Sequence, residues 1–231
     1  MKYLENGFFL LALTFIVYYL SLRLYKKSGW ALLNPILITV AVMITFLKLT
    51  GITFETYGEA GQYIEFWLKP AIVALGVPLY MQLEAIKKHF VPIFLSQLAG
   101  CIVGIVSVVS IAKIMGASKD VILSLAPKSV TTPIAIEVTC SVGGIPSLTA
   151  AVVIFVGILG AILGYKTMNM VHVKGAGAQG LSMGTAAHAV GTSASMAVSS
   201  EHGAYATLGL IVNGVLTSFM TPTILKLMGI L

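Results

Sequence analysis

Charged side chains are scarce in this chain. Asp, Glu, Lys and Arg make up only 10% of its 231 residues, whereas apolar residues make up 58%. An ordinary soluble domain carries about 25% charged residues. The shortage leaves too little polar surface to face water, so we expect an all-α polytopic membrane protein with a single transmembrane domain over residues 1–231. The formal charge of +6 is modest, and the basic residues lie in short loops, so no nucleic-acid partner is expected.

Cysteines are few, and the usual signatures of catalysis are missing. The two cysteines, Cys101 and Cys140, lie in apolar surroundings without metal-ligand spacing. The chain has no phosphate-binding loop, no paired-histidine zinc motif and no nucleophile elbow. The spacing of Ser129 or Cys140 from His188 gives no support to a nucleophile and its base. We therefore expect no enzyme, no metal and no cofactor.

Long apolar runs are what the chain does contain. A membrane-spanning helix needs about 20 apolar residues. Runs near that length cover 7–22, 30–50, 67–83, 90–112, 147–166 and 203–228, which predicts six full transmembrane helices. Basic residues at 23–27 and 87–88 mark cytoplasmic loops, whereas acidic residues at 55–65 mark an outer loop. This pattern places the N-terminus outside a bacterial cell membrane, although Lys113 and Lys119 then also lie outside.

Two broken segments interrupt the second half of the chain, at 121–144 and 178–200. Each precedes a full span, and the two units are offset by about 54–56 residues, which suggests an internal repeat. Two re-entrant segments would make the units inverted, a common plan in transporters, whereas fully crossing segments would not. We expect residues 1–112 to be scaffold-like and 113–231 to be the transport-like part.

The first interruption, residues 126–137, predicts an anion site. Thr132 before Pro133 is typical of a helix N-cap followed by its first residue, and free N–H groups there attract anions. Lys128 would supply charge, and Glu137 would balance it or carry a proton. The hydroxyls of Ser129, Thr131 and Thr132 would orient the ligand. In the alternative interpretation the prolines only kink a helix and Lys128 extends to the interface.

The second interruption carries one histidine on a stripe of glycines. Gly177, Gly180, Gly184, His188 and Gly191 follow helical spacing, which permits close approach of a neighbouring helix or a ligand. The glycines at 157, 160 and 164 could be the partner stripe. The histidine could take part in proton transfer. Thr185 and Thr192 add hydroxyls, and Asn34 and Asn213 are polar residues that could line the cavity. The alternative is a packing stripe.

The run Leu125-Ala-Pro-Lys-Ser-Val-Thr-Thr-Pro-Ile-Ala135, followed by Gly-Thr-Ala-Ala-His-Ala-Val-Gly-Thr at 184–192, resembles the LrgB/CidB family. Asn34-Pro35 and the small size also fit, and the similarity covers essentially the whole chain. The resemblance implies either holin- or antiholin-like modulation of murein hydrolases and autolysis or movement of small carboxylates. It also implies a small LrgA/CidA-type membrane partner.

The residues and the resemblance together predict a transporter of small monocarboxylates such as pyruvate, glycolate or glycerate. We expect a homo- or hetero-oligomer in membrane lipid. The expected binding residues are Lys128, Ser129, Thr131, Thr132, Glu137, Gly184, Thr185, His188, Gly191 and Thr192, with Asn34, Pro133 and Asn213 as candidates for lining the cavity. The rival hypothesis is a holin-like component in which both interruptions serve packing.

Overall fold

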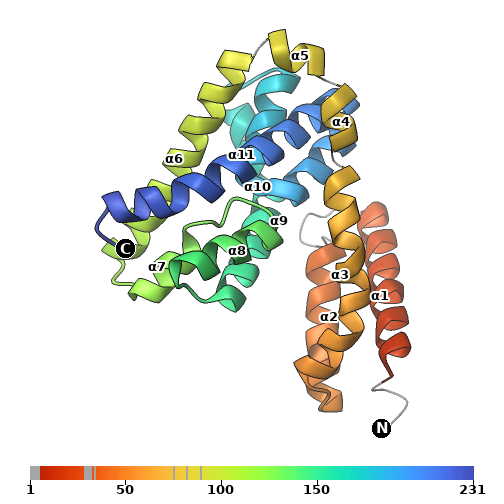
Figure 1. The fold of residues 1–231 in the computed structure, drawn as a ribbon. Helices are drawn as coiled ribbons and strands as arrows, with labels where there is room; N and C mark the ends of the chain where they lie inside the picture. The colour runs from red at the N-terminus through yellow and green to blue at the C-terminus, as the bar shows by residue number, and fades with distance from the viewer. Residues whose placement is uncertain (1–5, 29–32, 34, 75, 82, 89) are drawn as a thin grey trace. The chain divides into compact units, whose positions relative to one another are not determined.

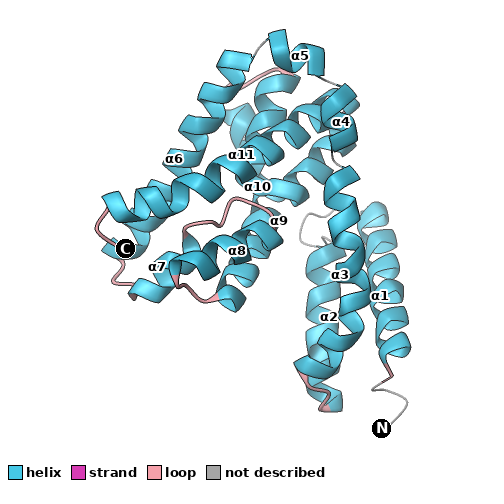
Figure 2. Ribbon diagram, in the orientation of Figure 1, coloured by secondary structure: helices cyan, strands magenta, loops and turns pink. Residues whose placement is uncertain are grey.

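The computed structural model describes residues 6–28, 33, 35–74, 76–81, 83–88 and 90–231, and these ranges contain helices but no strand (Figures 1 and 2). The expected all-α class is confirmed. The helices are α1 (Gly7–Ser28), α2 (Pro35–Thr50), α3 (Phe54–Ala74), α4 (Gly76–Met81), α5 (Leu83–Lys88), α6 (Phe90–Ile114), α7 (Lys119–Leu125), α8 (Thr132–Val142), α9 (Pro146–Met170), α10 (Ala176–Val198) and α11 (Ser200–Leu227). They form two compact units, Met1–Gly76 and Val77–Leu231.

The first unit is a small group of three helices, α1 to α3. Its core is the buried cluster of Leu10, Ile52 and Ala60. A hydrogen bond of 3.0 Å joins the hydroxyls of Thr14 on α1 and Tyr57 on α3. Most of the remaining apolar side chains of α1 are exposed, as in a helix that faces lipid. Asn34 lies outside the described residues, so its expected place in a cavity stays a prediction.

Four of the described helices, α1, α6, α9 and α11, are long and apolar enough to cross a membrane. Six were expected. The run at 30–50 is described as a helix only over Pro35–Thr50, which is 16 residues long. The run at 67–83 is described in parts, as the end of α3, all of α4 and the start of α5. Among the described residues the expected count of six spans is therefore not reproduced, because residues 30–32, 34, 75 and 82 of these runs lie outside them and the parts that are described give no helix of sufficient length and hydropathy.

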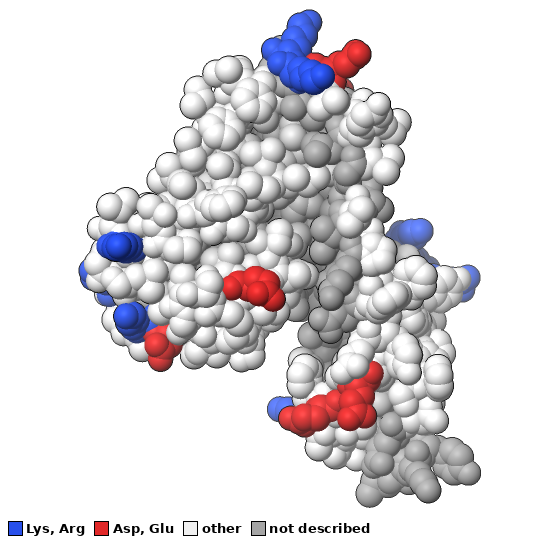
Figure 3. All heavy atoms as spheres, in the orientation of Figure 1, with Lys and Arg blue, Asp and Glu red and all other residues white. Residues whose placement is uncertain are grey.

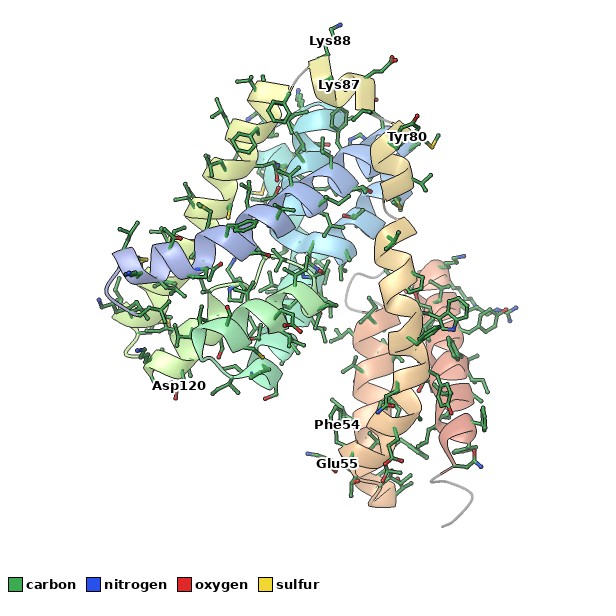
Figure 4. All side chains as sticks on the ribbon, in the orientation of Figure 1. Phe54, Glu55, Tyr80, Lys87, Lys88 and Asp120 are labelled. Carbon is green, nitrogen blue, oxygen red and sulfur yellow. The ribbon has the colours of Figure 1, made fainter. Side chains whose placement is uncertain are left out.

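Charged side chains occupy little of the surface, and wide areas carry none (Figure 3). In the second unit, Lys87 and Lys88 project from α5 at one end, and Asp120 projects from the start of α7 at the other (Figure 4). The 25 residues of α6 run between these two places. At about 1.5 Å per residue, they cover roughly 37 Å, more than the hydrocarbon core of a bilayer. Charged residues near the two ends of α6 fit a helix that crosses a membrane.

The first broken segment is a helical hairpin. Helix α7 ends at Leu125, residues 126–131 turn, and α8 leads back. The main-chain N–H of Ile145 donates to Ser124 Oγ at 2.7 Å, and Thr149 Oγ1 donates to Ser124 O at 2.9 Å. The residue that follows α8 therefore lies beside the last turn of α7, so the two helices form a hairpin.

The second broken segment is interrupted at His188, whose backbone angles of φ 41° and ψ −133° are not helical. A Cβ built on Gly191 would lie 2.5 Å from the carbonyl oxygen of Met183. In a straight helix, residues eight apart would be separated by about 12 Å along the axis. Near the start of α10, Gln179 Oε1 accepts a hydrogen bond from His202 Nε2 on α11 at 3.2 Å. Helix α10 therefore folds back on itself, and its start lies beside the start of α11.

The glycines of α10 pack against α11, which was not the expected partner. A Cβ on Gly184 would collide with the carbonyl oxygen of Ala206 and lie 2.8 Å from the N atom of Leu210. The expected partner stripe on α9 meets the stripe of α10 only at His188, against which Gly157 packs, and a Cβ on Gly160 would collide with the neighbouring Ala187. Small residues thus allow α10 to approach a helix on each side, and both contacts fix the position of the break at His188.

Candidate functional site

A cavity of about 630 Å³ lies in the second unit between α6, the α7–α8 turn and the first half of α10. Apolar side chains form most of its wall. The polar residues that line it are Ser96, Gln97, Lys128, Ser129, Ser182 and Thr185. Among the described residues, no carboxylate contributes to the lining. The cavity therefore combines one cation with hydroxyl and amide groups in an apolar concavity, as small-molecule sites do.

Lys128 is held in the turn between α7 and α8. Pro127 lies in this turn and has no N–H to continue the hydrogen bonds of α7, and the extended backbone of Thr131 ends the turn before α8, whose first turn contains Pro133. Lys128 Nζ donates to Ser129 Oγ at 2.9 Å. Within the described part of the chain, no carboxylate pairs with this ammonium. The half-buried cation therefore keeps donor capacity for a ligand.

Asn213 on α11 connects the two broken segments. Its Nδ2 donates to the carbonyl oxygen of Ser129 in the first and to that of Thr185 in the second, both at 3.1 Å. Asn213 is 1% exposed. The sequence suggested that Asn213 could line the cavity, whereas the structure places it behind the wall. It thus holds together two segments that lie 56 residues apart in the chain.

Thr185 on α10 and Gln97 on α6 line the same cavity as Lys128. Thr185 Oγ1 donates to Gln97 Oε1 at 2.6 Å and also lies 2.7 Å from the carbonyl oxygen of Leu181. A Cβ on Gly100 would lie 3.2 Å from Thr185 Cγ2, so α6 comes close to α10 here. The first half of α10 is therefore joined to α6 by a buried hydrogen bond between side chains.

His188 lies outside the cavity lining, at the break in α10. Its ring is 3% exposed, and Nε2 is 2.9 Å from the carbonyl oxygen of Val153 on α9. Thr192 Oγ1 donates to the carbonyl oxygen of His188 at 2.9 Å, so Thr192 also stabilises the break in α10. Gly157 leaves the space for the imidazole, since a Cβ there would lie 2.5 Å from His188 Cε1. Gly191, just beyond, packs against the carbonyl oxygen of Met183.

The start of α8 differs from the expected cap. The N-cap is Thr131, and Thr132 is the first helical residue, because the extended backbone of Thr131 ends the turn one residue earlier than expected. Thr131 Oγ1 is buried and has no hydrogen-bond partner. Pro133 and Glu137 line a second hollow of about 390 Å³, and Glu137 is exposed. The structure thus does not bring Glu137 into the cavity that Lys128 lines.

Gln97, Ser96 and Ser182 were missed by the analysis of the sequence. A usable signal was present for Gln97, because it is the amide in the otherwise apolar stripe Ile93, Gln97, Cys101 and Ile105, which is the buried face of α6. Such polar residues within a spanning helix usually face the protein interior or a cavity. Ser96 and Ser182 have no comparable signal, since serine is common on both faces of membrane helices.

Comparison with known proteins places the chain in a family. The model of the LrgB-like family matches residues 14–227. A holin-like protein CidB from Staphylococcus epidermidis is 35% identical over 226 residues, which cover 98% of this chain and 98% of the relative. An antiholin-like protein LrgB from Bacillus mycoides is 34% identical over 223 residues, which cover 96% and 97%. No solved structure matches the chain. The resemblance noted in the two motifs is thereby confirmed, and the chain belongs to the LrgB-like family of membrane proteins.

Proposed function

We propose that the chain transports small organic monocarboxylates, of the size of pyruvate, glycolate or glycerate, across the bacterial cell membrane. The observation that carries this proposal is Lys128, a cation without a carboxylate partner among the described residues, on the wall of a cavity of about 630 Å³. A buried charge is costly unless it is paired. A carboxylate in the cavity would pair this ammonium, so an anion is the ligand that gains most there.

The fold around the cavity supports movement of the ligand as well as its binding. Both broken segments are hairpins, and their tips come together at Asn213. Discontinuous helices that meet within a bundle form the substrate sites of many transporters, because unwound backbone can be exposed to a cavity there. We infer that the halves of the second unit, including α7–α8 and α10, rearrange around the site during transport.

The proposed roles follow the placement of the residues. Lys128 and Ser129 contact the carboxylate, and Thr185 lines the same cavity. Thr131, Thr132 and Pro133 shape the turn at the start of α8. Gly184, His188, Gly191 and Thr192 hold the break in α10. Proton coupling through His188, or through Glu137 at the second hollow, is a further element of the proposal. We propose a small LrgA/CidA-type protein as partner and an N-terminus on the outer side.

Uptake into proteoliposomes tests the proposal. Labelled pyruvate, glycolate and glycerate are offered to vesicles with the full chain, with and without the small partner protein. We expect uptake by the wild type and its loss, by at least about 10-fold, in Lys128→Ala, since a charge-assisted hydrogen bond contributes about 1.5–3 kcal/mol. Lys174→Ala, in the loop between α9 and α10, is the matched control and should keep wild-type uptake. Equal uptake in Lys128→Ala and wild type would contradict the assignment of the site.

A second function is favoured by the names of the relatives. Those that match over nearly the whole chain are called holin-like or antiholin-like. The corresponding proposal is a holin- or antiholin-like modulator of murein hydrolase activity and autolysis, in which the hairpins serve packing. Vesicles loaded with a large fluorescent dye separate the two proposals. Release of the dye without selective carboxylate flux favours the holin-like function, whereas selective flux with the dye retained favours transport.

A further inference from the structure

Gln97 presents an unused hydrogen-bond donor to the cavity. Its carboxamide oxygen is occupied, because it accepts from Thr185 Oγ1 at 2.6 Å. Its Nε2 has no hydrogen-bond partner among the described residues. The side-chain atoms that are both fully buried and unpartnered in these residues are Thr131 Oγ1 and Thr221 Oγ1. Nε2 of Gln97 is not among them, so it keeps accessible surface, and Gln97 lines the cavity.

Thr185 decides which end of the carboxamide faces the cavity. A carboxamide can offer either its oxygen or its nitrogen to a ligand. The hydroxyl of Thr185 lies 2.6 Å from this oxygen and 2.7 Å from the carbonyl oxygen of Leu181, so its one proton is shared between two acceptors, and the carboxamide nitrogen is the end without a partner. Gln97 is only 3% exposed, so packing restricts other orientations of the side chain. An amide that is fixed in this way before the ligand arrives loses little entropy on binding.

We propose that Gln97 is a specificity-determining residue that donates a hydrogen bond to a second oxygen atom of the substrate, and that Thr185 positions it. This inference rests on the proposed function, because it assumes that Lys128 binds the carboxylate. The chemistry of the two groups then differs. Lys128 binds any carboxylate through its charge, whereas Gln97 donates a hydrogen bond only to substrates that carry a hydroxyl or carbonyl oxygen on the carbon next to the carboxylate. An acid without that oxygen leaves the buried N–H unpaired, and such unpaired groups are the basis of strong discrimination.

The test compares two acids that differ by one oxygen atom, glycolate and acetate. Initial rates of uptake are measured with the full chain in proteoliposomes, and the readout is the ratio of the two values of kcat/KM. The wild type should prefer glycolate by roughly 10-fold, about the value of one hydrogen bond. In Gln97→Leu the ratio should fall to about 1, chiefly through slower uptake of glycolate, because acetate never used the amide.

Variants of Thr185 separate positioning from general damage. Thr185→Val keeps the shape but lacks the hydroxyl, so the ratio should fall toward 1, whereas Thr185→Ser keeps the hydroxyl and should restore it. Gln179→Leu is the matched control: this second buried glutamine of the unit bonds Asn169 and His202 and does not line the cavity. Its preference for glycolate should equal that of the wild type, even if its stability is lower.

Each result bears on a different claim. A ratio in Gln97→Leu equal to that of the wild type, or a wild type without preference, overturns the role of Gln97 and leaves carboxylate transport standing. Uptake of neither acid by the wild type overturns both proposals. If Gln97→Leu does not fold, Thr185→Val carries the same comparison, because it disturbs the orientation of the amide without removing it. An unchanged ratio in Thr185→Val then overturns the inference.

Discussion

Nδ2 of Asn213 donates a hydrogen bond of 3.1 Å to the carbonyl oxygen of Ser129, so the middle of α11 is joined to the turn that carries Lys128. The same atom donates to the carbonyl oxygen of Thr185 on α10. The two broken segments therefore share one donor. Because Asn213 is almost fully buried, water cannot replace these hydrogen bonds. Asn213 thus anchors both segments behind the cavity, so the distance between Lys128 and Thr185 should depend on it.

Replacement of Asn213 by aspartate is expected to destabilise the second unit. The shape is nearly unchanged, but an ionised carboxylate cannot donate and would face two carbonyl oxygens. Loss of buried hydrogen bonds costs about 1–3 kcal/mol, which corresponds to a fall of about 5 °C in Tm for a chain of this size. Thermal unfolding of the wild type and the variant in detergent measures this change in Tm. Asn169→Asp is the control, because the oxygen of Asn169 accepts from Gln179 and aspartate keeps that acceptor. Equal Tm values for the two variants would contradict the role of Asn213 in holding the two broken segments together.

His188 occupies a backbone conformation that favours glycine, with φ 41° and ψ −133°. Non-glycine residues in such conformations cost about 1–3 kcal/mol. His188→Gly and His188→Ala both lose the imidazole bond to Val153, but only the glycine variant relieves the backbone. We therefore expect His188→Gly to unfold at a higher temperature than His188→Ala, by about 2–6 °C. The reverse order would mean that the chain at this position does not adopt the described turn.

The sequence allowed the two breaks to be located but not the way they meet. Pro127 and Pro133 interrupt a helix by their own chemistry, so the first break could be predicted from composition. The placement of Glu137 could not, because it depends on the rotation of α8 about its axis, and that rotation is set by packing against α9 and α11. Gln97 escaped notice for a related reason, since its partner Thr185 is 88 residues away and no local pattern links them.

Gly157 is expected to tolerate no side chain. A Cβ there would lie 2.5 Å from His188 Cε1 and 2.8 Å from Nε2, so Gly157→Ala must displace the imidazole from the carbonyl oxygen of Val153. Overpacking of this kind costs about 1–3 kcal/mol. Gly61→Ala in α3 is the control, because its new Cβ meets no described atom within 4 Å and Gly61 does not line the cavity. We expect the first variant to lower Tm and to slow uptake, and the second to change neither. A tolerated Gly157→Ala would show that the ring is not seated there.

The cavity is expected to be reachable by water and to be protected by its ligand. The test uses a chain in which the exposed Cys140 is replaced by alanine, while the buried Cys101, bonded to Thr217, stays as an unreactive internal reference. Ser96→Cys, on the cavity wall, should react with a charged thiol reagent, and glycolate should slow that reaction several-fold, since a bound ligand blocks access. Ile102→Cys lies on an exposed side of the same helix α6 that does not line the cavity. In vesicles, lipid should cover it, and a charged reagent enters hydrocarbon poorly. Its slow reaction should not respond to glycolate. Equal protection at both positions would mean that the ligand changes the whole fold and not the occupancy of this cavity.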